Sequence, residues 1–139
     1  MKNRVIAAAV LAVVGGIGVA ATGAVTASAV TSSKVVLVGL NEFNIVPGKQ
    51  ASPAGKATFV LKNSGKATHE FVVVKTAKPA GNLMKGKEAD ETGAVDEVGE
   101  LKPGQTKKLT LTLTKGHYAL LCNLPGHYKG GQFVDFYVR

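Results

Sequence analysis

The sequence feature that most constrains the fold is a series of short apolar or alternating segments separated by Gly/Pro turns. The clearest example is "TKKLTLTLTKG" (106–116), in which Leu109, Leu111 and Leu113 alternate with threonines. A period of two places leucines on one face and threonines on the other, as in a strand with one buried face. This alternation predicts β-structure rather than amphipathic helices.

Seven segments have this character, and they occupy most of the region after residue 33. They are 34–40, 41–49, the two halves of 56–75, 106–116, 117–122 and 133–138. In the second half of 56–75 we expect Phe71 and Val73 on one face of the strand and Val72 and Val74 on the other. From Ala77 to Gly99 the periodicity disappears, which favours a loop or a short helix. The pattern predicts an all-β fold, an antiparallel β-sandwich of about seven strands with Greek-key connections.

Residues 1–29 have the features of a signal peptide. Two basic residues near the start are followed by an apolar run, and no further charged residue occurs before Lys34. Ala27-Ser28-Ala29 matches the small-residue pattern of a cleavage site. The run is also long enough for a retained membrane anchor, the alternative interpretation. We predict removal of residues 1–29 and export of a domain formed by 30–139 to the periplasm, the cell surface or the extracellular space. Membrane contact is expected only if the leader is retained.

Charge argues against nucleic-acid binding. The chain carries a formal net charge of +8, but its lysines are spread thinly, no arginines cluster and aromatic residues are few. Nucleic-acid proteins concentrate basic and stacking residues on one surface. Most of the acids lie between Glu88 and Glu100, so the charge is two-sided. A basic face of this kind can steer docking to an acidic partner or an anionic surface, and more often it only serves solubility.

The only cysteine lies in the stretch "CNLPGHYKGGQ" (122–132). A single cysteine cannot form an internal disulfide, and a free thiol is a liability in an oxidising compartment. The Pro-Gly turn allows Cys122 and His127 to leave opposite ends of one loop and converge, and a second Gly-Gly turn brings Gln132 close. Three donors leave a metal under-coordinated, so we expect His69, at the start of another strand, to complete the site.

The donor set favours one copper ion. Two histidines and a cysteine with a weak axial fourth ligand are typical of copper sites for electron transfer. Zinc is the competing metal, because it also binds histidine and cysteine, but structural zinc sites usually have closely spaced ligand pairs. This sequence has no such pair.

Two segments carry a resemblance to a known family. "GHYALLCNLPGHYKGGQ" (116–132) resembles the C-terminal signature of the cupredoxins, the blue-copper proteins of the plastocyanin and azurin type. "THEFVVVK" (68–75) resembles the segment that supplies their first histidine. The similarity extends over most of residues 34–139 and includes many exported bacterial members.

The resemblance implies the roles of the site residues. His69, Cys122 and His127 would be the three strong ligands of a type 1 copper. Gln132 stands where most members have methionine, and glutamine is the known substitute in the phytocyanin-like branch. Two roles for Gln132 remain open, an axial ligand or a residue that only approaches the metal.

Four neighbouring or chemically similar residues receive other roles. Met84 is interpreted as a surface or core-edge residue, and His117 as a surface histidine facing away from the cysteine. Asn123 is expected to hydrogen-bond the ligand loops together. Tyr128, beside the second histidine, is expected on the surface through which electrons leave.

These features together predict an exported type 1 copper protein that carries single electrons as Cu(II)/Cu(I). It is expected to be a monomer that docks transiently with redox proteins, and not an enzyme. The alternative is a copper-binding or copper-delivery protein outside the cytoplasm. Delivery proteins often use Met-rich or His-rich tracts, and this sequence has neither.

Overall fold

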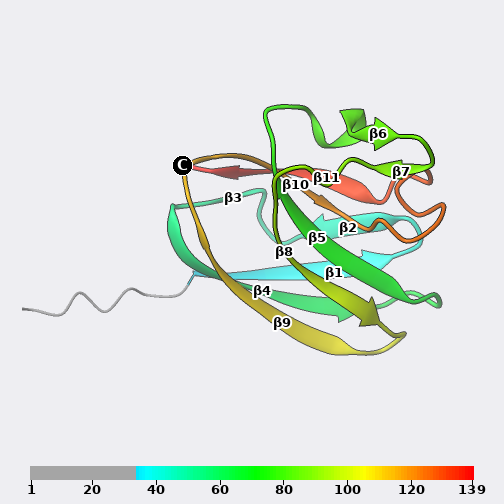
Figure 1. Ribbon diagram of the computed structural model, residues 1–139. Coiled ribbons are helices and arrows are strands. Elements are labelled where there is room, and N and C mark those ends of the chain that lie inside the picture. Colours follow the sequence, from blue (N-terminus) through cyan, green and yellow to red (C-terminus); the bar gives the residue numbers. More distant parts are fainter. Residues whose placement is uncertain (1–33) are drawn as a thin grey trace, which may run out of the picture.

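Eleven strands and one short 3-10 helix make up the part of the chain that the structure, a computed structural model, describes, residues 34–139 (Figure 1). The predicted signal peptide, residues 1–29, lies outside the described residues. The first five strands are β1 (Lys34–Asn41), β2 (Asn44–Pro47), β3 (Ala51–Ser52), β4 (Gly55–Asn63) and β5 (His69–Lys75). After them come η1 (Ala80–Asn82), β6 (Met84–Lys85), β7 (Glu88–Ala89), β8 (Ala94–Leu101), β9 (Thr106–Leu113), β10 (Gly116–Leu121) and β11 (Phe133–Val138).

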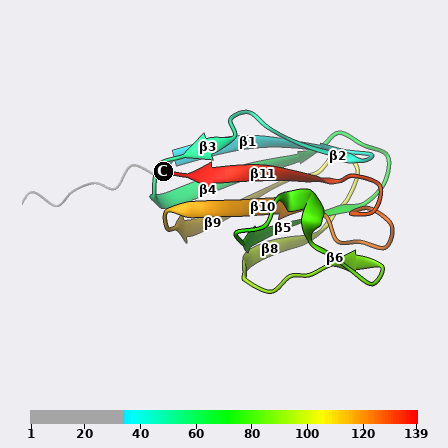
Figure 2. The same cartoon turned by 90° about the horizontal axis from the view of Figure 1, so that it is seen from above.

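The strands form two sheets packed face to face, as predicted for an all-β sandwich (Figure 2). One sheet has the order β2-β1-β4-β9 and the other β3-β11-β10-β5-β8, while β6 and β7 form a separate ladder. Two pairs, β1–β4 and β3–β11, are parallel, so the sandwich is not purely antiparallel as expected. β1 and β4 are parallel because the chain crosses to the other sheet, where it forms β3, before it returns to the first sheet as β4.

The main core lies between the sheets, and a second apolar cluster lies on the outer face of β5 and β10. Phe71 and Val73 belong to the main core, while Val72 and Val74 belong to the second cluster, which confirms the predicted alternation. Residues 76–93, here called the covering segment, supply Ala80, Leu83 and Ala89 to the second cluster. Both faces of β5 are therefore buried, and this strand begins at His69.

The prediction of a loop or short helix over Ala77–Gly99 was only partly right. The covering segment contains η1 and the small β6–β7 ladder, but β8 is a strand of eight residues paired with β5. It lies at the edge of its sheet and most of its side chains are exposed, so the apolar alternation that marks a half-buried strand is missing.

The two ends of the sandwich differ. β5 starts, β10 ends and β11 starts at one end, because Leu121 pairs with both Val72 and Phe133. The opposite end holds both ends of the described chain, since the Lys34 side chain and the Arg139 carbonyl both hydrogen-bond to Ala54 (Figure 1). Within residues 34–139, no helix has the length and apolar character required to cross a membrane.

Candidate metal centre

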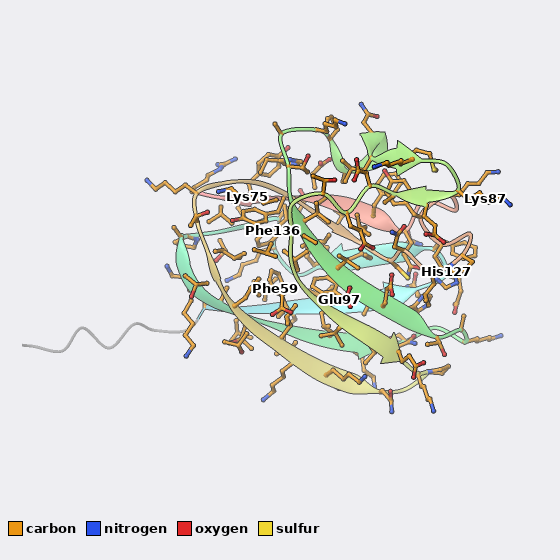
Figure 3. All side chains as sticks on the ribbon, in the orientation of Figure 1. Phe59, Lys75, Lys87, Glu97, His127 and Phe136 are labelled. Atoms are coloured by element: carbon orange, nitrogen blue, oxygen red, sulfur yellow. The ribbon has the colours of Figure 1, made fainter. Side chains whose placement is uncertain are left out.

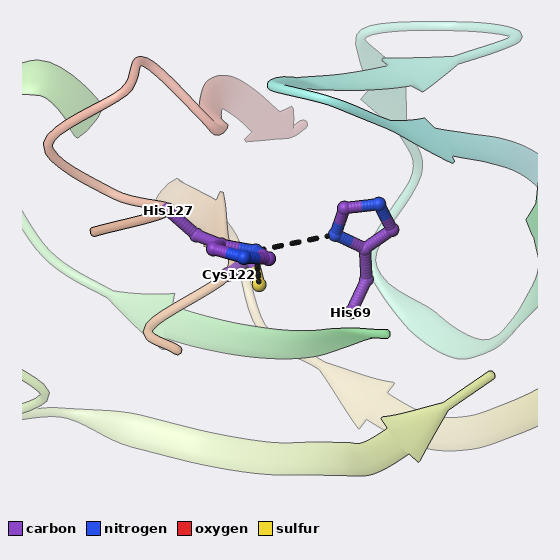
Figure 4. Close-up of side chains that lie close together, drawn as sticks. All are labelled: His69, Cys122 and His127. Atoms are coloured by element: carbon purple, nitrogen blue, oxygen red, sulfur yellow. Dashed lines mark hydrogen bonds between the residues drawn. The ribbon is translucent and has the colours of Figure 1, made fainter. Parts of the chain in front are cut away.

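Three predicted donors converge at the end of the sandwich where β5 begins (Figure 4). Nδ1 of His69 lies 3.3 Å from Nδ1 of His127, and Sγ of Cys122 also lies 3.3 Å from the latter atom. His69 and Cys122 are fully buried, whereas His127 is partly exposed and lies at the rim of the molecule (Figure 3). This difference agrees with the sequence, which places His127 on a loop and His69 in a strand.

The sheet register explains this convergence. His69 is the first residue of β5, Cys122 directly follows β10, and Gln132 directly precedes β11. The backbone N–H of Cys122 donates to the carbonyl of Gln132 over 3.0 Å, which continues the β10–β11 pairing by one step. His69, Cys122 and Gln132 are therefore positioned by the ends of paired strands rather than by loops alone.

Tight turns bring His127 back toward Cys122. The N–H of His127 donates to the carbonyl of Leu124 over 2.9 Å, closing the predicted Pro-Gly turn. Gly126 has a φ of 84° and Gly131 a φ of 103°, values that glycine adopts without strain. A second turn follows, and the N–H of Gln132 donates to the carbonyl of His127 over 3.1 Å.

The amide of Gln132 is buried between the two histidines. Its Nε2 donates to the carbonyl oxygens of Asn41 and Asn44, over 2.9 and 3.4 Å, and lies 3.0 Å from Nδ1 of His69. Carbonyl oxygens only accept hydrogen bonds, so the nitrogen must face them. Oε1 is thereby turned toward the site, 3.0 Å from Nδ1 of His127. The geometry brings Gln132 to the site, and its coordination of a metal stays a prediction.

The protonation states suit a soft cation. Burial, and then the nearby His127, lower the pKa of His69, which keeps that imidazole neutral and able to bind a metal. Burial raises the pKa of the Cys122 thiol, so a metal must displace its proton. Two imidazole nitrogens and a thiol sulfur, with one amide oxygen beside them, form a donor set that fits copper.

Comparison with known proteins identifies the family. The model of the cupredoxin-like domain matches residues 12–134, most of the chain. The chain belongs to the cupredoxin-like family. Its site is therefore a His/Cys copper site, and the chain is a copper protein of the cupredoxin type.

Individual relatives are distant. This cupredoxin is 27% identical over 145 residues to the copper-resistant cuproprotein CopI of Pseudomonas aeruginosa, covering 81% of this chain and 80% of CopI. It resembles dithionite-reduced auracyanin of Roseiflexus castenholzii with a TM-score of 0.58 and 28% identity, covering 77% of this chain and 98% of auracyanin. Rusticyanin of Thiobacillus ferrooxidans, at 20% identity and a TM-score of 0.57, shares the fold over 78% of this chain and 79% of its own.

At the cupredoxin site, hydrogen bonds of Asn123 join the residue after Cys122 to β5 and to the covering segment. Asn123 donates its backbone N–H to Oε1 of Glu70 over 2.8 Å, and its side chain bonds Ala89 and Glu91 of the covering segment. The prediction that Asn123 holds the ligand loops together was only partly right, because its backbone N–H makes the link to the strand of His69 while its side chain bonds the covering segment, which supplies none of the predicted ligands. Burial raises the pKa of Glu70, and the neighbouring acidic side chains add to this effect.

The expectation for Tyr128 was wrong. Its side chain is buried, and its hydroxyl accepts from the N–H of Leu83 and donates to the carbonyl of Ala80. The covering segment closes over the ring, so Tyr128 contributes no surface for electron exit. Its place next to the partly exposed His127 suggested an exposed side chain, and nothing in the sequence indicated that a segment some 45 residues earlier covers it.

His117 and Met84 lie outside the donor cluster. His117 is partly buried rather than fully on the surface, with Nδ1 2.7 Å from the carbonyl of Thr76 and Nε2 2.7 Å from Oδ1 of Asp135. Both ring nitrogens thus face acceptors. Met84 is exposed on β6, as its interpretation as a surface residue predicted.

The β1–β2 turn is the part of this cupredoxin site that sequence reasoning missed. Asn41 and Asn44 hold Gln132 through their backbone carbonyls, which no sequence motif reveals. Phe43 packs edge-on against His127, with ring centroids 5.3 Å apart. The turn also carries Glu42, whose carboxylate approaches His69.

Proposed function

We propose that this cupredoxin is an exported one-electron carrier with His69, Cys122 and His127 as strong copper ligands and Gln132 as the axial ligand. Bound copper supplies the Cu(II)/Cu(I) couple. The observation that carries the proposal is that all four side chains converge at one end of the sandwich, each held by strands or by backbone hydrogen bonds. A site held in this way by the fold needs little rearrangement when the charge of its metal changes, which is what fast electron transfer requires.

The axial role of Gln132 is supported by its amide orientation. The amide nitrogen faces carbonyl acceptors in the β1–β2 turn, so Oε1 is the amide atom left to face the metal. An amide oxygen is a harder donor than the thioether of methionine and favours Cu(II).

The partners and the location belong to the same proposal. We infer that the mature chain, after loss of residues 1–29, acts outside the cytoplasm as a monomer and docks transiently with redox proteins. The partly exposed His127, with exposed Phe43 against it, is the ligand nearest solvent and supports electron exchange at this end. A carrier of this kind would not itself be an enzyme.

Copper delivery is the second candidate, and one observation favours it. The relative from Pseudomonas aeruginosa is a copper-resistant cuproprotein by name, and it aligns with four fifths of this chain. In a delivery protein, copper is cargo that leaves after reduction or on meeting a partner.

Redox cycling in the presence of a water-soluble Cu(I) chelator distinguishes the two functions. Copper-loaded protein would be reduced and reoxidised repeatedly, with the bound copper measured after each cycle. A carrier retains its copper and gives a reversible voltammetric wave. Transfer of most of the copper to the chelator in the first reduction would contradict the carrier proposal and support delivery.

A further inference from the structure

Glu42 lies beside the one side-chain nitrogen of His69 that faces away from the donor cluster. Nδ1 of His69 points toward His127, while Nε2 lies 3.3 Å from Oε1 of Glu42. This contact does not meet the geometry of a hydrogen bond, and within residues 34–139 the buried Nε2 has no hydrogen-bond partner. Glu42 is therefore the one acceptor placed to serve this nitrogen.

The tautomer of His69 makes that nitrogen a donor. When Nδ1 binds a metal, the proton of a neutral imidazole must be on Nε2. Metal-binding histidines almost always pass this second N–H to a carboxylate or a carbonyl, which sets the ring orientation and raises the basicity of the ligand. A buried N–H without an acceptor would cost free energy.

Glu42 is itself fixed in place by the turn that precedes His69. Its Oε1 accepts hydrogen bonds from the backbone N–H groups of Lys66 and Ala67. Gly65 packs directly on the carboxylate of Glu42. A side chain would not fit there, since an added Cβ would lie 2.6 Å from Oε1. One carboxylate thus binds the segment leading into β5 and faces the ring of the first residue of β5.

The charge of Glu42 has no basic counter-ion from the rest of the described chain. Among residues 34–139, no lysine or arginine forms an ion pair with it, and the basic side chain beside it is the neutral imidazole of His69. A negative charge close to a metal ligand stabilises the more highly charged ion of a redox pair.

We propose that Glu42 is a positioning residue of the copper site, which accepts the Nε2–H of His69, keeps Nδ1 toward the metal and favours Cu(II) over Cu(I) by its charge. This inference rests on the proposed assignment of His69 as a copper ligand. It adds a residue of the β1–β2 turn that acts through His69 without touching the metal.

Two variants separate the hydrogen bond from the charge. Glu42→Gln removes the charge but keeps an oxygen that can accept from Lys66, Ala67 and His69, whereas Glu42→Ala removes both. Asp96→Asn is the matched control, since it also removes one negative charge, from an exposed position opposite Val73 on β8.

Voltammetry of the copper-loaded proteins measures the charge effect. We expect Glu42→Gln to shift the preference toward Cu(I) about tenfold, which raises the potential by about 59 mV for one electron. Asp96→Asn should shift it by much less. Equal potentials in these two variants would overturn the role of the Glu42 charge.

Proton NMR of the His69 ring measures the hydrogen bond, in Cu(I)-loaded protein and in the metal-free chain. The Nε2–H resonance should be protected from exchange in the wild type and in Glu42→Gln, and should exchange at least tenfold faster in Glu42→Ala. Unchanged exchange in folded Glu42→Ala overturns the positioning role.

The design separates this inference from the carrier proposal. Loss of copper on reduction would refute the carrier function, while the Cu(I) complex would still report the Nε2–H of His69. If the wild-type chain takes up no copper at all, the resonance of the metal-free protein still decides whether Glu42 accepts from His69.

Discussion

The backbone N–H of Glu70 donates a hydrogen bond to Sγ of Cys122 over 3.3 Å. Because Glu70 directly follows His69, the strand that supplies the first histidine also holds the sulfur. A hydrogen bond to sulfur favours the thiolate and opposes the effect of burial, which raises the pKa of this thiol. The sulfur position is therefore set by β5 as well as by the loop after β10.

Cys122→Ser should remove the intense visible band of the Cu(II)-loaded protein. That band arises from charge transfer between a thiolate and copper, and a hydroxyl oxygen cannot supply it. Absorption spectra of the wild type and the variant at equal copper content test this. Tyr128→Phe, which leaves all four donors intact, should keep the colour. A coloured Cys122→Ser protein would show that the sulfur is not a ligand.

Gln132→Met should raise the reduction potential while the visible band survives. A thioether sulfur stabilises Cu(I) more than an amide oxygen does, and each tenfold change in this preference is about 59 mV. Voltammetry of both proteins should show a rise of at least that order. Equal potentials would mean that Gln132 only packs beside the metal.

The metal-free Gln132→Met protein should also be less stable by about 0.5–1.5 kcal/mol, because the carbonyls of Asn41 and Asn44 lose a donor. Urea denaturation without copper measures this loss independently of the potential. An unchanged midpoint and slope would contradict the role of these hydrogen bonds.

Glu70→Gln should stabilise the metal-free protein at neutral pH. The pKa of Glu70 is raised in the folded state by burial, and then by Glu91, Glu97 and Glu88 nearby. Ionising Glu70 therefore costs more in the folded than in the unfolded chain, so stability is lost as pH rises through the folded pKa. Glutamine stays neutral and still accepts from the N–H of Asn123.

Urea denaturation of metal-free protein across a pH series tests this effect. The advantage of Glu70→Gln should shrink as the pH falls through the raised pKa of folded Glu70, and it should be absent below the ordinary glutamate pKa, about 4.3, where Glu70 is protonated in both states. Asp96→Asn, at an exposed position, serves as the control. A stability difference independent of pH would contradict the explanation.

Tyr128→Phe should destabilise the fold by about 1–3 kcal/mol. The hydroxyl joins Leu83 and Ala80 of the covering segment, and its removal leaves a buried N–H and a buried carbonyl unpaired. Thermal or urea unfolding measures the loss, and exposed Tyr137→Phe should change stability by much less. Equal effects of the two variants would contradict a structural role for the Tyr128 hydroxyl.

The sequence predicted best where local patterns carry the information. The alternating leucines of β9 and the two-sided β5 have a clear period of two, and both strands were identified. The donors Cys122 and His127 lie on one loop with a Pro-Gly turn, so their convergence was predictable from spacing. β8 was missed because its side chains are mostly exposed and three of its eight residues are acidic, and an edge strand needs no apolar alternation.

Contacts between distant segments could not be predicted in this way. Glu42 meets His69 across two sheets, and the carbonyls of Asn41 and Asn44 bind an amide about 90 residues later. Every residue has a backbone carbonyl, so the residue types do not indicate which carbonyl will accept such a bond. Tyr128 was misplaced for the same reason, since its burial depends on how the covering segment packs.

The chain ends described by the structure lie at the opposite end of the sandwich from His127 and Phe43. β1 alone has eight residues, and at about 3.3 Å per residue it separates the two ends by about 25 Å. A linker attached at Lys34 or Arg139, whether to a bilayer, an electrode or a fused protein, therefore emerges from the far end. A tethered molecule would present its metal face outward, ready for collision with whatever exchanges electrons with it.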